Sequence, residues 1–511
     1  MMEQRIGIID IGSNSVRLVI YERTASGAHR VIDGSKRPVR LSERITEDGS
    51  LSEEAVTELL DTLRHFGLIC AHHQTGHIRA VATAAVRNAA NRDQVLSRIQ
   101  AESGLVIELL SGKDEAEYGF IGMINAMDVK DGYLIDIGGG STELSLFQDR
   151  KLVHSISFPF GCVSLNRRFA AKGMVSDESM RALESLVSSS LSSVSWLRDL
   201  PGLPLIGVGG TVRSLGKISQ AVTKYPFTQT HNYPITGDAV DQLFDQLRKL
   251  PLDKRRKFPG LSKDRTDLIV PGLAVLRVIY KAIHASHYKI CGAGLRDGLF
   301  YTTRFPDRPK LSDVLSYSLQ NLSALHPEAP KQHVSQVNRL GLQLFDFLHP
   351  LRQDKLPPRA RVWLDTASTL FRIGASIDYY EYSKHSFYLI TNSRLNGLSH
   401  REILIIGAIA SYKSKNRVRQ LLADYKELLN ETDYQVIYEL GILLHLAIAL
   451  DRSETQAIGR LSMEEEGKQL HLLPVRSHGS LAVERREVEA LSEDFYKLWS
   501  VSPVLAQTDY T

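Results

Sequence analysis

The stretch that decides the fold lies at residues 10–17, which read Asp-Ile-Gly-Ser-Asn-Ser-Val-Arg. Apolar residues flank it on both sides, and small turn-forming residues stand in its middle. This pattern predicts a strand, a tight turn and a second strand between Arg5 and Glu22. Successive backbone N–H groups in such a turn can bind an anion, and small side chains let a phosphate approach them. Asp10, at the end of the first strand, supplies the kind of carboxylate that Mg²⁺ prefers.

Residues 136–143, Asp-Ile-Gly-Gly-Gly-Ser-Thr-Glu, repeat this pattern between Tyr133 and Phe147. A third glycine turn at residues 209–211 follows an apolar strand and opens a predicted helix. One such turn could be an ordinary β-hairpin, but two copies with a preceding aspartate favour a duplicated phosphate site. Neither of the two duplicated turns fits a dinucleotide fingerprint, which requires a helix directly after the turn, and the sequence contains no P-loop motif.

The composition is that of a soluble protein with several domains. At 511 residues the chain is long enough for about three or four domains. The 62 Lys and Arg nearly balance the 58 Asp and Glu, which argues against nucleic acid as the main partner. Three distant cysteines exclude a disulfide scaffold and suit a reducing compartment. We see no signal peptide and no apolar run that could span a bilayer, so we expect a cytoplasmic protein without a membrane partner.

Strands and helices alternate to about residue 305, which predicts an α/β region. We expect helices at residues 51–69, with Ser52 as the N-cap, at 91–102 and at 114–126, and strands at 77–81 and 105–110. A Pro- and Arg-rich linker follows at residues 304–310, and amphipathic helical patterns dominate beyond it, as at 333–348, 362–375 and 401–410. A strand-like tail at 469–473 and 480–483 closes the chain.

Three acids, Asp114, Glu115 and Glu117, begin the predicted helix after residues 111–113. Acids in a first helical turn stabilise the helix macrodipole and need no catalytic role. Alternatively, one of them faces the phosphate site and orients or deprotonates an attacking water. The spacing does not choose among the three.

Taken in order, these residues resemble the Ppx/GppA family of exopolyphosphatases and guanosine pentaphosphate phosphohydrolases. The resemblance covers nearly all of residues 5–300. It implies an actin-like ATPase (ribonuclease H-like) fold, with one lobe at residues 1–125, a second at 126–305, and an all-helical HD-like domain at 310–511. The matching motifs are Asp10–Arg17, Ala82–Ala89, Ser111–Ala116, Asp136–Glu143, Gly209–Thr211, Leu261–Gly272 with Arg265 and Asp267, and Gly294–Gly298.

The resemblance also implies roles for individual residues. Glu115 matches the catalytic base, and Asp136, Asp10 and Glu143 match carboxylates that hold a metal or position water, Asp136 being catalytic as well. The implied cofactor is Mg²⁺, with Mn²⁺ as its substitute. The implied phosphate-binding residues are Gly12, Ser13, Asn14, Ser15, Arg17, Thr83, Arg87, Gly138, Gly139, Gly140, Ser141, Thr142, Gly209, Gly210, Thr211 and Arg265.

The C-terminal part is similar to the HD-like domain of longer family members. His333 stands at the position of that fold's first histidine, but residues 371–374, Phe-Arg-Ile-Gly, replace the metal-binding His-Asp pair. This argues against a second, metal-dependent site, and we interpret His385 and His400 as structural or surface histidines. The basic residues Lys413, Lys415, Arg417 and Arg419 are either a solvated helix face or part of a path for a long polyanion.

The predicted function is hydrolysis of terminal phosphates from inorganic polyphosphate by a homodimer, with a water activated by Glu115. The alternative within the family is conversion of guanosine pentaphosphate to the tetraphosphate. Two other classes remain open: an actin-like ATP-dependent kinase or filament with an adenosine pocket near residues 207–211, and an alarmone sensor without turnover.

Overall fold

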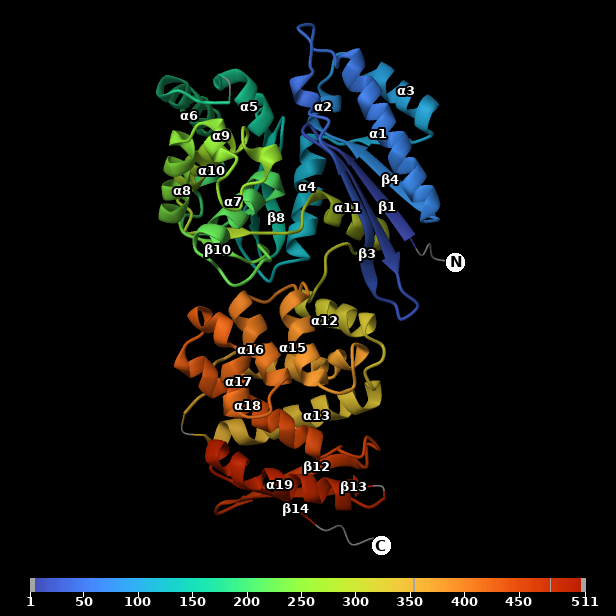
Figure 1. The fold of residues 1–511 in the computed structure, drawn as a ribbon, viewed down its shortest axis with the longest axis vertical. Coiled ribbons are helices and arrows are strands. Elements are labelled where there is room, and N and C mark those ends of the chain that lie inside the picture. The colour runs from blue at the N-terminus through green and yellow to red at the C-terminus, as the bar shows by residue number, and fades with distance from the viewer. Residues whose placement is uncertain (1–4, 172, 353, 478, 507–511) are drawn as a thin grey trace. The chain divides into compact units, whose positions relative to one another are not determined.

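The structure is a computed structural model that describes residues 5–171, 173–352, 354–477 and 479–506 (Figure 1). The chain divides into two compact units. The first comprises Met1–Ala25 and His29–Val314, and the second comprises Ser26–Ala28 and Leu315–Thr511. The division falls shortly after the linker expected at residues 304–310. Each unit is described separately below.

The first unit contains two sheets with a shared plan. The first has the strand order β3-β2-β1-β4-β5 and the second the order β10-β11-β9-β6-β7-β8. Their strands are β1 (Arg5–Ile11), β2 (Val16–Arg23), β3 (His29–Arg37), β4 (His77–Ala82) and β5 (Ile107–Leu109), then β6 (Gly132–Ile137), β7 (Thr142–Gln148), β8 (Lys151–Phe158), β9 (Leu205–Val208), β10 (Pro234–Ile235) and β11 (Tyr288–Ile290).

The two sheets are built around equivalent hairpins. β1 pairs antiparallel with β2 and parallel with β4, just as β6 pairs antiparallel with β7 and parallel with β9. The turns match as well: the Gly12 N–H donates to the Ser15 carbonyl at 3.3 Å, and the Gly138 N–H to the Ser141 carbonyl at 2.9 Å. The weak repeat in the sequence is therefore a structural duplication, as expected for the actin-like fold.

Helices cover both sheets and enclose apolar cores. Ile9 and Ile11 of β1 are buried in one core with Leu59, Leu60 and Leu63 of α1 (Glu53–His72). A second core forms around β6, β7 and α10 (Ile269–Ala282). Ser52 caps α1 as predicted, since its hydroxyl accepts the Ala55 N–H. The helices are α1 (Glu53–His72), α2 (Ala84–Arg87), α3 (Arg92–Ser103), α4 (Gly112–Ile124), α5 (Cys162–Phe169), α6 (Asp177–Ser192), α7 (Gly209–Val222), α8 (Gly237–Lys249), α9 (Leu252–Arg255), α10 (Ile269–Ala282) and α11 (Leu295–Arg304).

The second unit is mainly helical, as expected, and also carries a sheet with the order β12-β13-β14. Its elements are α12 (Val314–Leu325), α13 (Lys331–Leu348), α14 (Ala360–Leu370), α15 (Tyr382–Asn392), α16 (His400–Ala410), α17 (Lys415–Leu421), α18 (Glu431–Ala449), β12 (Ile458–Glu466), β13 (Gln469–Ser477), α19 (Ala482–Trp499) and β14 (Ser502–Leu505). No helix among the described residues is both long and apolar enough to cross a membrane.

Two expectations for this unit are wrong. Residues 480–483, expected as a strand, form none: 480 and 481 precede α19, and 482 and 483 begin it. The buried Val488, Phe495 and Leu498 of this helix follow a helical period. The helix expected at residues 362–375 stops at Leu370, and a short 3-10 turn follows. A side chain at Gly374 would collide with the carbonyl of Tyr382, so the backbone packs too closely there for a continuing regular helix.

Candidate functional site

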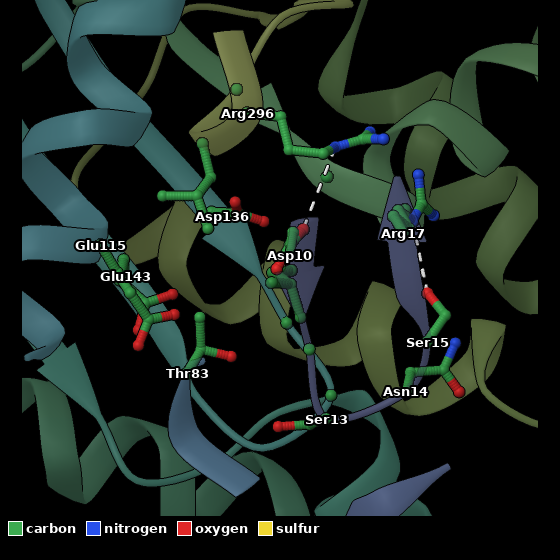
Figure 2. Close-up of a pocket in the computed structure, with 18 of the residues that line it drawn as sticks. Asp10, Ser13, Asn14, Ser15, Arg17, Thr83, Glu115, Asp136, Glu143 and Arg296 are labelled. Carbon is green, nitrogen blue, oxygen red and sulfur yellow. Dashed lines mark hydrogen bonds and ion pairs between the residues drawn. The ribbon is translucent and has the colours of Figure 1, made fainter. Parts of the chain in front are cut away.

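A cavity of about 130 Å³ lies in the first unit, where the two duplicated turns meet. Figure 2 shows side chains from both hairpins pointing into it. The structure thereby brings together most of the residues that the sequence singled out. Those that line the cavity are Asp10, Gly12, Ser13, Asn14, Ser15, Arg17, Thr83, Glu115, Asp136, Gly138, Gly139, Ser141, Glu143, Gly209, Gly210 and Arg265.

Four of the expected phosphate-binding residues do not line this cavity. Arg87 instead bonds to the Glu115 carboxylate and donates to the Leu110 carbonyl at 2.7 Å. The Thr142 hydroxyl donates to the Phe160 carbonyl at 2.7 Å, in the interior. Gly140 lines a second cavity, and Thr211 is buried in the protein interior. These four residues therefore lie outside the lining of this cavity.

The cavity also contains residues that the sequence did not single out as site residues. Arg213 from α7 and Arg296 and Asp297 from α11 line it. Arg213 lies in the first helical turns after the glycine turn at residues 209–211, and Arg296 belongs to a motif that we quoted only as a family mark. Both lie near the start of a helix that follows a strand of the second sheet, α7 after β9 and α11 after β11, but this position alone does not show that they reach the cavity.

The same cavity is rich in arginine, with Arg17, Arg213, Arg265 and Arg296 around it. Burial lowers the pKa of Arg17 to about 10, and repulsion from Arg296 and Arg213 contributes. Burial likewise lowers the pKa of Arg213, again with repulsion from Arg296. Burial is the larger cause of both shifts and repulsion between the arginines adds to it; a bound polyanion would favour the charged form of each arginine.

Carboxylates face the same space. Burial raises the pKa of Asp136 to about 6, with Asp10 adding to the shift. Burial also raises the pKa of Asp10, although Arg296 lies 3.9 Å from it. The pKa of Glu143 is held well above its usual range by burial and by the nearby Glu115, even though the Ser157 hydroxyl donates to Glu143 at 2.8 Å.

The structure separates the three acids at the start of α4. Asp114 is used in a capping box, where it accepts the Ser111 N–H at 2.8 Å. Glu117 is exposed and does not line the cavity, whereas Glu115 lines it and its side chain is only 11% exposed. Burial raises the pKa of Glu115 to about 7, against the lowering effect of Arg87. Of the three acids, Glu115 is therefore the one that lines the cavity.

Glycine is required where backbone passes closest to these charged groups. Gly209 has φ 81°, and a side chain there would overlap the Asp136 carboxylate. A side chain at Gly210 would overlap the Arg265 guanidinium. The third glycine turn thus serves mainly to let Asp136 and Arg265 approach the backbone of α7.

The carboxylates fit a hard cation. Asp10, Asp136 and Glu143 line one cavity, and burial is the main cause that raises the pKa of each. Among the described residues no group of three or more His, Cys, Asp or Glu is arranged to hold a metal ion by itself. Mg²⁺ needs no such group, since it usually takes one or two carboxylates and completes its shell with water and phosphate oxygens.

The second unit holds a buried His–Asp pair. His333 Nδ1 lies 2.8 Å from Asp451 Oδ2, and the Phe371 ring packs edge-on against the histidine. The basic residues of α17 and its approach are exposed and partly paired: Lys413 and Arg417 lie 3.9 and 3.8 Å from Glu381. Arg419 pairs with Glu431 at 3.0 Å.

Comparisons with known proteins agree with this fold and site. The profile of the Ppx/GppA phosphatase family matches residues 19–304, and that of Ppx/GppA phosphatase domain III matches residues 319–482. A Haemophilus influenzae protein named "Putative exopolyphosphatase" is 29% identical over 301 residues, covering 58% of this chain and 91% of its own.

Two solved structures give the same result. The Aquifex aeolicus Ppx/GppA family member is 26% identical with a TM-score of 0.52, covering 60% of this chain and 99% of its own. An exopolyphosphatase from Cytophaga hutchinsonii is 25% identical with a TM-score of 0.54, and the match covers 60% of this chain and 100% of the Cytophaga chain. The duplicated sheets, with a cavity between their two glycine turns, define the class of protein as actin-like. Within that class, the chain belongs to the Ppx/GppA phosphatase family.

Proposed function

We propose that this phosphatase is an exopolyphosphatase, which hydrolyses terminal phosphates from inorganic polyphosphate. The observation that carries the proposal is the convergence of four arginines and two anion-binding turns on one small cavity, beside the buried carboxylate of Glu115. The cavity suits a terminal phosphoryl group, and arginine forks suit its oxygens. The names of the Haemophilus and Cytophaga relatives support polyphosphate as the substrate.

In the proposed reaction Glu115 accepts a proton from a water as that water attacks the terminal phosphorus. The bridging P–O bond breaks, its electrons stay on the shortened chain, and orthophosphate is released. The leaving chain is already a stable anion, so no strong general acid is needed. Phosphoryl transfer depends chiefly on positioning and charge stabilisation. Asp10, Asp136 and Glu143 would hold Mg²⁺, which supplies charge neutralisation to the phosphate oxygens.

The protein's own residues provide the remaining positioning. Arg17, Arg213, Arg265 and Arg296 would orient the phosphate oxygens, and the backbone N–H groups of the two turns would fix the terminal group between them. Arg87 holds the Glu115 carboxylate from the side of α2. A base held in this way is ready to orient the water.

The test compares phosphate release from long-chain polyphosphate and from guanosine pentaphosphate under identical conditions with Mg²⁺. We expect kcat/KM to be higher for polyphosphate. A clear preference for guanosine pentaphosphate would instead support the nucleotide phosphohydrolase. Release from neither substrate, together with ATP turnover, would support an actin-like kinase.

A further inference from the structure

A second cavity, of about 370 Å³, adjoins the first and plays no part in the chemistry above. We call it the outer cavity. It is lined by Ser42 and Asn88, from the elements around the first sheet, and by Ser164, Arg167 and Arg168 of α5. Gly140, from the second duplicated turn, also lines it.

Neighbouring residues of the chain line the two cavities, and we call the first one, of about 130 Å³, the inner cavity. Thr83 and Gly139 line the inner cavity, and their chain neighbours Ala84 and Gly140 line the outer one. A hydrogen bond also joins the two linings, because the N–H of Ser42, in the outer cavity, donates to the carbonyl of Ser13, in the inner one, at 3.1 Å. A ligand group in the outer cavity would therefore lie close to a phosphate held in the inner one.

The lining of the outer cavity is mixed: among the described residues it has two arginines and no carboxylate. The other lining residues are the polar Ser42, Asn88 and Ser164, and the apolar or small Ile45, Ala84, Ala85 and Gly140. Arg167 donates to the Ile45 carbonyl at 3.2 Å, and Arg168 lies over the Phe169 ring. Neither arginine is paired with an acid among the described residues. Both lie in the last turn of α5, where a cation also complements the helix dipole. The dipole explains a positive charge at this helix end but not the neighbouring hydroxyl and amide groups of Ser42 and Asn88.

We propose that the outer cavity is an anion subsite, which binds a second phosphate group of the same substrate whose terminal phosphate occupies the inner cavity. The proposal rests on the proposed function, because it assigns the outer cavity to the polyphosphate chain beyond the scissile bond. Guanidinium groups supply paired donors to phosphate oxygens, and serine hydroxyls and an asparagine amide supply further donors.

This placement has a kinetic consequence. A contact made to a group remote from the reacting phosphorus, equally in the ground and transition states, lowers KM without raising kcat. Because Arg167 and Arg168 are exposed, the contribution is screened by salt. The outer cavity therefore acts on affinity for chains long enough to reach it.

The experiment compares the wild type with the double variant Arg167→Gln/Arg168→Gln. The matched control is Arg181→Gln/Arg256→Gln, which removes two exposed arginines that line neither cavity. Polyphosphates of increasing length are assayed at low and high salt. We expect kcat of the double variant to be unchanged and its KM for long chains to rise about three- to tenfold, the size expected from the loss of two exposed ion pairs. This increase in KM should become smaller for shorter chains and at high salt.

Equilibrium binding of polyphosphate, measured without turnover, separates this proposal from the proposed function. If the double variant binds polyphosphate more weakly than both the wild type and the control variant, the subsite is supported. This holds even if the wild type releases no phosphate, a result that would contradict only the proposed function. Equal affinity and equal KM for the wild type and the double variant at every chain length would overturn the subsite. An identical loss in the control variant would also overturn it, since it would reflect net charge alone.

Discussion

At the scale of single residues, we expect substitution of Glu115 to have the largest effect on turnover. Glu115→Gln keeps the shape of the side chain but removes the base, so we expect turnover to fall by about 10²–10⁴-fold while substrate binding persists. Phosphate release and equilibrium binding are the two measurements. Glu117→Gln is the control, because Glu117 is exposed on the same helix and does not line the cavity. Wild-type turnover in Glu115→Gln would show that another group is the base.

The pKa of Glu115 predicts a pH dependence. A base must be ionised, and burial raises the pKa of Glu115 to about 7, so kcat/KM should fall as the pH drops below about 7. Arg87 lowers this pKa, so Arg87→Gln should move the acidic limb to higher pH. The control is Arg92→Gln, at an exposed arginine next along the chain. An unmoved limb in Arg87→Gln, with reduced affinity for substrate, would instead indicate that Arg87 contacts phosphate.

We expect the buried carboxylate of Asp136 to lower the stability of the metal-free protein at high pH. Its folded-state pKa of about 6 lies above the usual value, so the favourable contribution of the neutral form is present below about pH 4 and is lost as the pH rises through 6. Without metal, Asp136→Asn should be more stable than the wild type at pH 8 by about 1–3 kcal/mol, and equally stable at pH 4. Thermal unfolding at both pH values tests this.

Addition of Mg²⁺ should reverse the order of stability, because a cation bound to the native state stabilises it. We expect Mg²⁺ to raise the Tm of the wild type more than that of Asp136→Asn. The variant should also release phosphate more slowly than the wild type. Full wild-type activity in excess chelator would contradict the metal assignment.

At the scale of elements, the segment at residues 36–40 ties the first sheet to the loop that carries Arg265. Arg40 has the left-handed φ of 50° and its N–H donates to the Asn14 carbonyl at 3.0 Å, next to the first turn. Its guanidinium reaches Asp267 at 2.9 Å, and Lys36 bonds to Asp264. Arg265 is thus held from both of its flanks.

A double-mutant cycle on Arg40→Gln and Asp267→Asn measures this link. We expect each change to lower kcat/KM several-fold, and a coupling of about 0.5–1 kcal/mol, small because both side chains are partly exposed. The Arg44–Glu58 pair, which lines neither cavity, is the control. Additive effects at Arg40 and Asp267 would show that the pair does not position Arg265.

The sequence predicted those elements whose signal is local. The two hairpins follow from apolar runs around glycine turns, and α1 from its serine cap. β3 and β8 were not predicted, since they lie at or near a sheet edge, where polar residues interrupt the apolar pattern. Arg213 and Arg296 reach the cavity only through tertiary packing, which no local pattern encodes. For the same reason, the bond between Arg87 and Glu115 was not predictable from either residue's surroundings.

At the scale of the molecule, every residue that lines the two cavities lies before residue 314. We therefore expect a chain ending at Val314 to fold as the first unit and to hydrolyse short polyphosphates. This end point keeps Leu311, whose N–H donates to Asn125 at 2.8 Å. We expect the shortened chain to lose preference for long substrates, because the exposed basic residues after 310 supply weak, salt-sensitive charge contacts. Rates on short and long chains at low and high salt test this, and an unchanged preference would assign the helical unit another role.

The duplication also determines when the site can exist during synthesis. The inner cavity takes its first lining residue, Asp10, from the start of the chain and its last, Asp297, from near the end of the first unit. A ribosome adding roughly 5–20 residues per second needs about 15–60 s to pass from one to the other. Over that interval the early turn is made and can fold, but its partner turn and arginines do not yet exist. A nascent chain therefore has no hydrolytic activity until the first unit is almost fully translated.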